Sequence, residues 1–416
     1  MLVTQILKDV YMPKEEVFSI MDNLWNAEKL YGRDAVIKSV LGCFHDENEN
    51  LVVMEVVDET YKSFSSVDLF GYATALTGSY DYKETVKKHI LGNKYFSNFN
   101  IGVTATIGGS GAISNVIRGY TDPGQTILLP EYMWEPYKVF AKSNGLNYES
   151  YVLFDGDKFS LDDLARKVIK IAKKQRKTVL LINDPCHNPT GYSLSFEEWE
   201  QIMKILEEAA KFGDVVLLND VAYLDYDFRG HSEARRHFKL FSNLPENILT
   251  VIAFSISKSL TCYGLRVGAA VAISSSREVI DDFNRVSAVL CRSTWSTVPK
   301  GGMDLFVKLH EDGNLSARLM AERDNIIGIL KKRSAVFMEE AEKIGLHHLP
   351  FSGGFFLTIP LDTETARNVI QDLKSKNVFV LPIDGGLRIA LCSVQTIKLR
   401  LLAQHLHDSI SRFKVN

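Results

Sequence analysis

The sequence has few cysteines, and their spacing is not that of a metal site. It contains five in 416 residues, and none falls in a CxxC or cysteine/histidine pattern that ligates zinc. No apolar run is long enough to cross a bilayer, and no basic leader precedes a long apolar segment near the amino terminus. We therefore expect reduced cysteines, no bound metal, no membrane partner and a cytoplasmic location. The cysteines are Cys43, Cys186, Cys262, Cys291 and Cys392.

An excess of charge of either sign is also absent. The formal net charge is −3 at pH 7, which gives no electrostatic reason to expect nucleic acid as a partner. Hydrophobic residues make up 46% of the chain and charged residues 24%, close to the averages of globular proteins. A chain of this length exceeds the usual size of a single core. We expect a folded protein of two domains, in which local side chains meet any charge on a substrate.

Several short apolar runs, rich in β-branched residues, each end in glycine or polar residues. They cover 101–107, 126–129, 178–183, 215–218 and 248–254, and amphipathic helical segments separate them. This alternation predicts an α/β fold with a mainly parallel sheet and helices on both faces. The carboxyl ends of such strands meet at one edge of the sheet, where open α/β sheets bind ligands.

The last quarter of the chain has the pattern of a smaller unit. Apolar residues recur at helical spacing over 314–344, which suits a helix that links two domains. Short strand-like runs at 355–359, 378–382 and 387–390 follow, and a helical pattern covers 396–413. These segments predict a small α+β domain beside the larger sheet.

A lysine comes directly after one of the most apolar runs. Ser255, Ser257 and Lys258 follow the strand-like residues 248–254, and Arg266 lies between two nearby glycines. A lysine at a strand end is usually a solvated charge, because lysine is rarely buried. Two cations and two hydroxyls at one strand end instead suggest a site for a phosphorylated anion, where the lysine could form a Schiff base.

A glycine-rich turn follows the run 101–107. Gly108, Gly109 and Ser110 stand where this strand ends and a helix begins. Glycines let the backbone approach an anion, and the amide groups at a helix start favour negative charge. The turn therefore resembles a phosphate-binding cup, although such a turn is often only a tight connection. Its pattern is neither GxGxxG nor the GK[ST] of a P-loop.

Aromatic side chains follow the run 126–129. Tyr132, Trp134 and Tyr137 lie just beyond the predicted strand end. An aromatic at this place can belong to the core or can stack on a flat cofactor ring. The residues alone leave both readings open.

Two further strand ends carry hydrogen-bonding groups. The run 178–183 leads into a loop of turn-forming residues with Asn188, whose amide can bind a ligand, and with Thr190, which we expect to cap the helix that begins near Ser195. The run 215–218 leads to Asp220 and Tyr223. The strand ends thus bring together an amide, a carboxylate and a phenol.

Pyridoxal 5′-phosphate uses all of these groups. It needs a lysine for covalent attachment, a carboxylate for its protonated ring nitrogen, a donor to its 3′-oxygen, a phosphate site and a ring to stack on. The same edge of the predicted sheet offers each of them.

The sequence resembles the fold-type I, class I pyridoxal-phosphate-dependent aminotransferases, and within them the aspartate and aromatic amino acid branch, over nearly its whole length. The most specific matches are His187-Asn188-Pro189-Thr190-Gly191, Asp220-x-x-Tyr223, Ser255-x-Ser257-Lys258 and the pair Arg266 and Gly268. The resemblance implies a seven-stranded sheet in a large cofactor-binding domain and a small domain built from both termini. The implied division is 1–55 for an arm and part of the small domain, 56–315 for the large domain and 316–416 for the remainder.

The resemblance also implies a role for each site residue. Lys258 would bind the cofactor covalently, Asp220 would pair with the ring nitrogen, and Asn188 and Tyr223 would bind the 3′-oxygen. Trp134 would stack on the ring, with Tyr132 as a rival. The phosphate would lie between Gly108, Gly109, Ser110, Ser255, Ser257 and Arg266, within reach of Tyr72 from a neighbouring subunit.

Two arginines bear on the substrate. By the same resemblance Arg388 would bind the substrate α-carboxylate, and Arg292, with Ser296 beside it, would cross the interface of a homodimer to meet a distal carboxylate. We therefore expect amino transfer from aspartate, glutamate or an aromatic amino acid to a 2-oxo acid such as 2-oxoglutarate. A lyase or decarboxylase on the same scaffold is the alternative, because cofactor motifs alone do not choose which bond breaks. A cofactor-sensing regulator would need a DNA-binding module, of which the sequence shows no sign.

Overall fold

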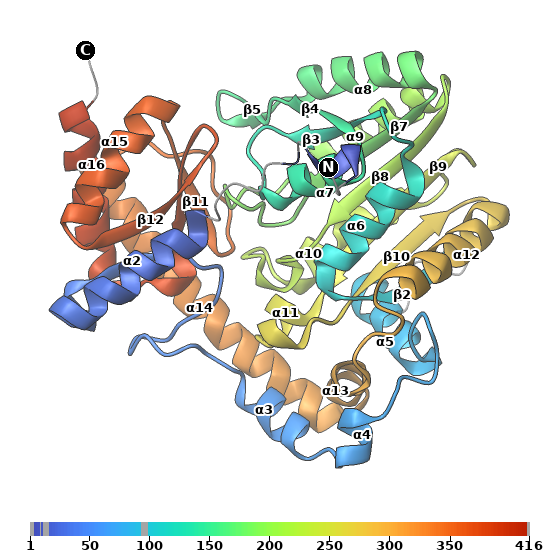
Figure 1. Ribbon diagram of the computed structural model, residues 1–416, viewed down its shortest axis with the longest axis horizontal. Coiled ribbons are helices and arrows are strands. Elements are labelled where there is room, and N and C mark those ends of the chain that lie inside the picture. Colours follow the sequence, from blue (N-terminus) through green and yellow to red (C-terminus); the bar gives the residue numbers. More distant parts are fainter. Residues whose placement is uncertain (1–3, 9, 11–15, 93–98, 414–416) are drawn as a thin grey trace.

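The structure of the chain is a computed structural model that describes residues 4–413 except 9, 11–15 and 93–98. Its helices and strands form two sheet-based parts, with a long helix running between them (Figure 1). Within the described residues, no helix has the length and apolar character needed to cross a membrane.

The larger part is built on a seven-stranded sheet with the order β2-β10-β9-β8-β7-β3-β4. Six of its strands run parallel, and only β10 is antiparallel to its two neighbours. The predicted α/β class and mainly parallel sheet are therefore confirmed. The strands are β2 (Asn100–Thr106), β3 (Thr126–Pro130), β4 (Asn147–Tyr151), β7 (Lys177–Asn183), β8 (Asp214–Asp220), β9 (Ile248–Ser255) and β10 (Gly268–Ser274).

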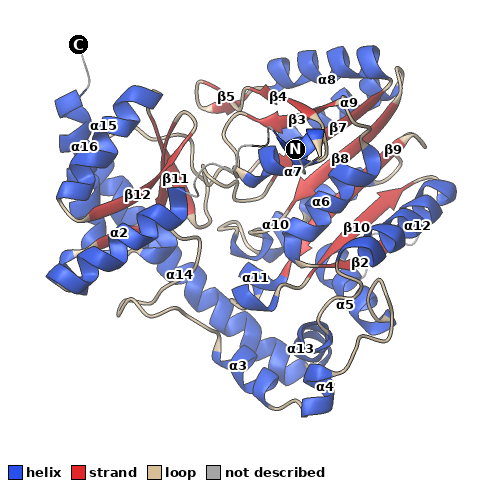
Figure 2. Cartoon of the chain, viewed as in Figure 1, coloured by secondary structure: helices blue, strands red, loops and turns tan. Residues whose placement is uncertain are grey.

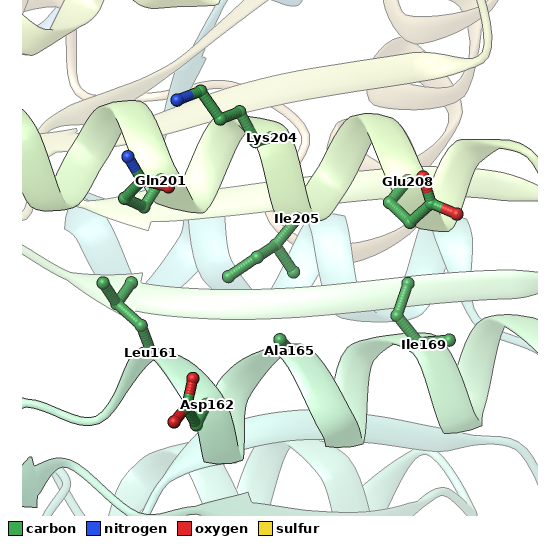
Figure 3. A pocket seen from close by; sticks show the side chains of 8 residues that line it. All are labelled: Leu161, Asp162, Ala165, Ile169, Gln201, Lys204, Ile205 and Glu208. Carbon is green, nitrogen blue, oxygen red and sulfur yellow. The ribbon is translucent and has the colours of Figure 1, made fainter.

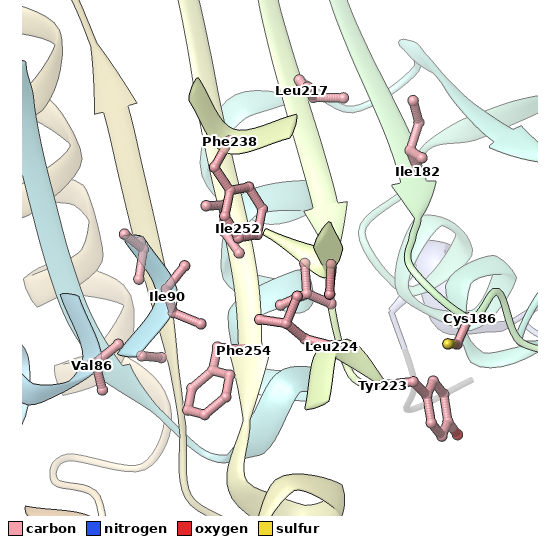
Figure 4. Packing of buried hydrophobic residues seen from close by; sticks show 14 of the residues in the cluster. Val86, Ile90, Ile182, Cys186, Leu217, Tyr223, Leu224, Phe238, Ile252 and Phe254 are labelled. Carbon is pink, nitrogen blue, oxygen red and sulfur yellow. The ribbon is translucent and has the colours of Figure 1, made fainter. Parts of the chain in front are cut away.

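Helices cover both faces of this sheet, and the side chains of each strand alternate between two cores (Figure 2). On one face Leu217, Ile252 and Phe254 pack with Val86 of α5 and with Phe238 (Figure 4). The opposite face packs against α6, α7 and α12. Because neighbouring side chains on a strand point to opposite faces, a strand covered on both sides is apolar throughout. This explains why the runs in the sequence do not alternate with polar residues.

The remaining helices of this part pack around the sheet and its edges. A short hairpin, β5 and β6, lies outside the main sheet. The helices and the hairpin strands are α1 (Gln5–Lys8), α3 (Glu55–Lys62), α4 (Ser66–Phe70), α5 (Tyr80–Leu91), α6 (Gly108–Tyr120), α7 (Pro136–Ser143), β5 (Phe154–Asp155), β6 (Lys158–Phe159), α8 (Leu161–Gln175), α9 (Phe196–Ala210), α10 (His231–Ala234), α11 (Ile256–Ser259), α12 (Arg277–Thr294) and α13 (Lys300–Glu311).

The smaller part combines segments from the two ends of the chain. Its four-stranded sheet has the order β1-β12-β13-β11, in which β1 pairs parallel with β12 and the other pairs are antiparallel. The expected small α+β unit is thus present, while the domain boundaries at 55/56 and 315/316 stay a prediction. The elements are α2 (Glu16–Tyr31), β1 (Ile37–Ser39), β11 (Phe356–Pro360), α15 (Thr363–Ser375), β12 (Val378–Ile383), β13 (Gly386–Ala390) and α16 (Leu399–Phe413).

The long helix α14 (Gly313–Ile344) connects the two parts, as its apolar spacing predicts. Asp312 caps it by accepting hydrogen bonds from the amide groups of Asn314 and Leu315, which otherwise have no partner inside the helix. Gly345 ends it in a left-handed conformation with φ 71°, which glycine adopts without strain.

One expected cap is wrong. Ser195, and not Thr190, caps α9, and it forms a capping box with Glu198. The hydroxyl of Thr190 instead lies 2.9 Å from Nδ1 of His187, inside the loop that precedes the helix. The hydroxyl of Thr190 is used within the loop, so Ser195, which lies nearer to α9, accepts a hydrogen bond from the first turn of this helix.

The pairing of the central strands places their ends side by side. Asn183, the last residue of β7, pairs with Asp220, the last residue of β8, and Asp220 pairs with Ala253 of β9. The segment that carries Lys258 begins directly after β9. The groups predicted from separate runs therefore meet at one edge of the sheet.

Candidate functional site

A cavity of about 210 Å³ lies at the carboxyl edge of the seven-stranded sheet. The backbone and side chains that surround it come from six regions of the chain that are far apart in sequence. It contains most of the residues singled out in the sequence. Its walls are Cys43, Gly109, Ser110, Ile113, Trp134, Tyr137, Asn183, Asn188, Asp220, Ala222, Tyr223, Ser255, Ser257, Lys258, Tyr263 and Arg266.

Lys258 lies on the single turn α11, which the hydroxyl of Ser255 caps by accepting the amide of Ser257. Its amine donates a hydrogen bond to the carbonyl oxygen of Gly42 at 2.6 Å and lies 4.6 Å from the centre of the Tyr263 ring. Burial lowers the pKa of the amine below its ordinary value, because a low-dielectric surrounding disfavours the charged form. A lysine in this state is more readily a base or a nucleophile than a solvated one.

Asp220 is buried at the end of β8, and both of its oxygens accept hydrogen bonds. Tyr137 donates to Oδ2 at 2.5 Å, and the amide of Ala222 donates to Oδ1 at 3.1 Å. Burial raises the pKa of this carboxyl to about 6, although the two hydrogen bonds act against the rise. The carboxylate lies inside the cavity and favours a cationic partner there.

A glycine turn and an arginine form one wall of the cavity. Gly108 begins α6 with φ 62°, and a Cβ at this position would lie 2.9 Å from Nη2 of Arg266. Arg266 is itself left-handed, with φ 54°, and it donates to Ser257 Oγ at 3.2 Å and to the carbonyl of Tyr263 at 2.9 Å. The glycine thus makes room for the guanidinium at the start of a helix, where an anion is favoured.

Arg388 reaches this region from β13 of the small sheet. Nη1 donates to Asn188 Oδ1 at 3.2 Å, Nη2 donates to the carbonyl of Val40 at 2.6 Å, and the guanidinium lies 4.2 Å from the Phe356 ring. The Nε donor is buried and has no hydrogen-bond partner among the described residues. A buried donor without a partner is unusual, and it is available to a carboxylate ligand.

Two aromatic residues that the sequence left as rivals occupy different places. Trp134 lines the cavity and packs edge-on against Tyr137, with the ring centres 5.5 Å apart. Tyr132 is not part of the lining and instead contacts Gly385, where an added Cβ would lie 2.9 Å from its ring.

Tyr72 and Arg292 do not take part in this cavity. Tyr72 is 91% exposed in the loop after α4. Arg292 lies in the last turn of α12, is exposed, and donates to Ser296 Oγ at 2.8 Å. Within one chain the structure therefore leaves both side chains facing outward.

The cavity also contains residues to which the sequence gave no role. Asn183 accepts the amide of Asn188 at 2.7 Å and so shapes the loop that carries it. Cys43 and Tyr263 flank Lys258, and Tyr137 bonds Asp220. In the sequence, the only sign of these residues is that they follow a predicted strand or stand beside a glycine. Their contacts join segments that lie far apart in the chain, so no local pattern predicts them.

Two other features of the molecule do not have the character of this site. A surface groove of about 350 Å³ lies between α8 and α9, with aliphatic walls that include Ala165 and Ile205 (Figure 3). Its lining contains no cysteine, histidine or hydroxyl group. Its charged side chains, Asp162, Lys204 and Glu208, are exposed to solvent, unlike the buried Asp220 of the cavity.

A cluster of the buried His89 and Asp225 with the exposed His231 has the donor types of a metal site. Arg235, however, donates to Asp225 Oδ1 at 2.5 Å and lies 3.2 Å from His89 Nε2. A metal ion held by these atoms would stand against a guanidinium, and the positive charges would repel each other. The cluster is better described as a neutralised charge network.

The sequence profile of the family described as aminotransferase class I and II matches residues 42–406. The chain belongs to this family. The aminotransferase is 24% identical over 378 residues to the aromatic-amino-acid aminotransferase of Paracoccus denitrificans, covering 89% of this chain and 92% of the relative. It is 20% identical over 407 residues to the mitochondrial aspartate aminotransferase of Gallus gallus, covering 93% and 91%.

Solved structures agree with this assignment. An aminotransferase from Anaerococcus prevotii shares the fold with a TM-score of 0.94 at 33% identity, covering 98% of this chain and 99% of that one. An aromatic-amino-acid aminotransferase from Burkholderia pseudomallei, covalently bound to pyridoxal phosphate, has a TM-score of 0.78 at 18% identity, with 98% and 100% covered. The predicted family, the pyridoxal-phosphate cofactor and the amino-transfer reaction are confirmed, and the lyase or decarboxylase alternative is not favoured.

Proposed function

We propose that this aminotransferase moves an amino group from aspartate, glutamate or an aromatic amino acid to a 2-oxo acid such as 2-oxoglutarate. The observation that carries the proposal is the meeting of Lys258, Asp220 and the Asn188–Arg388 pair at one sheet edge. They supply an anchor for the cofactor, a partner for its protonated ring nitrogen and a fork for a carboxylate. The names of the relatives support aromatic and acidic donors.

The donor set of the cavity fits pyridoxal 5′-phosphate. At Gly108 a Cβ would displace the guanidinium of Arg266, which donates to Ser257, and Ser110 and Ser255 line the same cavity. Amide groups at a helix start together with a guanidinium favour a phosphate dianion. The position of Trp134 in the lining supports it, and not Tyr132, as the stacking residue. The residues that would hold the cofactor are Gly108, Gly109, Ser110, Trp134, Asn188, Asp220, Tyr223, Ser255, Ser257, Lys258 and Arg266.

Lys258 has the properties of the residue that moves the proton. The bound cofactor supplies an electron sink for the substrate Cα. Lys258 would take the proton from the substrate Cα and could deliver it to C4′ of the bound cofactor, and its lowered pKa increases the fraction of neutral amine that can act as the base. The carbonyl of Gly42 can hold the amine inside the cavity between these steps. Asp220, as a buried anion, keeps the ring nitrogen protonated.

The substrate carboxylates are assigned to two arginines. Arg388 would bind the α-carboxylate, since its buried Nε has no other partner and its planar fork matches a carboxylate. Arg292 would meet a distal carboxylate in the site of a neighbouring subunit, because it faces outward in its own chain. Tyr72, which is also exposed, would reach the neighbouring phosphate.

A homodimer is part of this proposal. Large apolar side chains are exposed on α4, on the loop that follows it and on α12, among them Phe70 at 85%, Tyr72 at 91% and Val289 at 60% exposure. Arg292 lies one turn beyond Val289 on the same helix. A second copy of the chain that covers these side chains would remove them from water. A cytoplasmic location is also proposed, and the five free cysteines support it.

The lysine provides the test of the function. We expect the cofactor-loaded protein to convert aspartate, glutamate or phenylalanine to the 2-oxo acid in single-turnover reactions. Lys258→Ala should lose both covalent attachment, measured by peptide mass after borohydride reduction, and essentially all turnover. Lys211→Ala, which removes an exposed lysine at the carboxyl end of α9, should lose neither. Full activity of Lys258→Ala, or attachment at another lysine, would overturn the assignment.

A further inference from the structure

Tyr137 is a buried phenol in the cavity wall to which the proposed function gives no role. It lies in the first turn of α7 and is 0% exposed. The Trp134 ring stands nearly perpendicular to it, at 87°, and limits its rotation. Its hydroxyl donates to Asp220 Oδ2 at 2.5 Å, the short distance typical of a hydrogen bond between a hydroxyl and an ionised carboxylate.

We propose that Tyr137 is a positioning residue of the aminotransferase, whose phenol keeps the Asp220 carboxylate ionised and turned toward the ring nitrogen of the cofactor. The inference rests on the proposed role of Asp220 as partner of that nitrogen. A carboxylate offers about four acceptor sites, and Tyr137 and the amide of Ala222 occupy one on each oxygen. The two bonds fix the plane of the carboxylate and leave its other acceptor sites for the cavity.

Within the part of the chain that the structure describes, no cation forms an ion pair with Asp220. Burial raises its pKa to about 6, and the contacts that oppose the rise are Tyr137 first and the amide of Ala222 second. Asp184, at the end of β7, turns away and accepts from Trp199 and from the amide of Leu194. Five other titratable side chains line the cavity, and among the described residues none forms a hydrogen bond or ion pair with the carboxylate. They are Cys43, Tyr223, Lys258, Tyr263 and Arg266.

The phenol is a constant donor. Burial raises the pKa of Tyr137 well above 10, and the neighbouring Asp220 raises it further. Tyr137 therefore stays protonated at any working pH and never becomes an anion that would repel the carboxylate. A donor with this property stabilises the ionised form of Asp220 over the whole range in which that carboxyl titrates.

The size of the effect follows from the charge on the acceptor. A hydrogen bond to an ionised group contributes about 1.5–3 kcal/mol, which corresponds to about 1–2 pKa units. Tyr137→Phe should raise the pKa of Asp220 in the cofactor-free enzyme by that amount. A cofactor with a protonated ring binds the ionised carboxylate, so below this pKa binding must first release a proton. The affinity then falls about tenfold for each pH unit.

The test is the dissociation constant of pyridoxal 5′-phosphate as a function of pH, measured by equilibrium titration from about pH 5 to about pH 9. In wild type we expect a break near pH 6, the pKa of Asp220. In Tyr137→Phe the break should move up by about 1–2 pH units, while the affinity above the break changes only several-fold. Tyr151→Phe is the matched control, because Tyr151 is an equally buried phenol that donates to the carbonyl of Leu181. Its break should not move.

Three further proteins separate positioning from simple packing. In an Asp220→Asn background Tyr137→Phe should no longer move the break, so the double variant should differ in affinity from Asp220→Asn by the same factor at every pH. A fluorinated tyrosine at position 137, which keeps the shape but is a stronger donor, should move the break to lower pH. This last protein also decides the question if Tyr137→Phe does not fold.

An unchanged break in both the phenylalanine and the fluorotyrosine proteins would overturn the inference and leave the proposed function intact. A wild-type enzyme that neither binds the cofactor nor transaminates would instead contradict the proposed function. The two failures are therefore distinguishable.

Discussion

Lys258 donates a hydrogen bond to the carbonyl oxygen of Gly42 at 2.6 Å, although 216 positions separate the two residues in the chain. The same loop holds the second cation of the site, because Arg388 donates to the carbonyl of Val40, also at 2.6 Å. The loop after β1 thus contacts the lysine of the large sheet and the arginine of the small one. A substrate carboxylate bound at Arg388, as proposed above, would add a charged acceptor beside this neutral one, and bonds to a charged acceptor are stronger.

The first prediction concerns the fork of Arg388. Arg388→Lys keeps a positive charge but cannot form two parallel hydrogen bonds to a carboxylate. A bond to a charged group contributes about 1.5–3 kcal/mol, so kcat/KM should fall at least about tenfold for every amino acid donor. The measurement compares aspartate and phenylalanine half-reactions. A loss confined to aspartate would show that Arg388 binds the side chain of the substrate.

A second prediction concerns the charge network behind the lysine. Asp225 accepts from Ser259, the residue after Lys258, and from Arg235, while Arg323 of α14 donates to the carbonyl of Ser259 at 3.1 Å. Burial by itself would raise the pKa of Asp225, but Arg323, His89 and Arg235 outweigh it and hold the pKa well below its usual range. The network joins the lysine turn to the long helix.

Removal of one buried partner leaves the others uncompensated. Arg323→Met should lower the free energy of unfolding by about 3 kcal/mol, measured by urea denaturation. Arg318→Met is the control, because Arg318 lies on the same helix and forms an exposed pair with Glu59. The control should change stability very little. Equal, small effects of both substitutions would show that the network does not hold the turn.

The third prediction concerns pH and the stability of the cofactor-free enzyme. The pKa of Asp220 is about 6 in the fold and about 3.9 in an unfolded chain. Between these values the folded state binds more protons, so stability falls as pH rises through this window. Asp220→Asn removes the titration. The unfolding free energy of this variant, relative to that of wild type, should therefore increase by up to about 3 kcal/mol from pH 4 to pH 7. A difference between the two proteins that does not vary with pH would contradict a buried anion at Asp220.

The meeting of the strand ends at one edge could be predicted, because the alignment of parallel strands does not depend on individual side-chain contacts. Asp220 and Lys258 each follow an apolar run, and runs of this kind align their carboxyl ends in one sheet. Asn188 could be predicted by the same argument, because it lies in a loop of turn-forming residues that follows another apolar run. The turn at Gly108 could be predicted in the same way, because the close approach of the backbone at this helix start requires glycine, and the glycines stand in the sequence.

The partners of these groups could not be predicted. Tyr137 contacts Asp220 because of the way α7 packs at the edge of the sheet. No local pattern in the sequence predicts that packing. Arg388 of β13 contacts Val40 directly after β1, and this contact depends on how the two ends of the chain combine in the small sheet. Tyr72 and Arg292 face outward in one chain, so the roles proposed for them require a second copy.

The last prediction uses Arg292 to decide how the substrate side chain is recognised. Arg292 is exposed at the end of α12, and its one side-chain hydrogen bond among the described residues of its own chain is to Ser296. If it meets a distal carboxylate in a dimer, Arg292→Asp removes an attraction and places an anion against aspartate or glutamate. Both changes weaken the binding of an acidic donor, and they act strongly because the site is partly desolvated.

We expect kcat/KM for aspartate to fall by at least about a hundredfold, or roughly 2.7 kcal/mol. Phenylalanine should lose much less, and a cationic donor such as arginine should gain. Arg285→Asp is the matched control, since Arg285 lies on the same helix and pairs with Asp282 on the surface. Sedimentation of wild type and both variants would show whether either substitution changes the oligomeric state. Equal losses for aspartate, phenylalanine and arginine would assign Arg292 to the structure of the interface, because a side chain that reads charge must discriminate among these three donors.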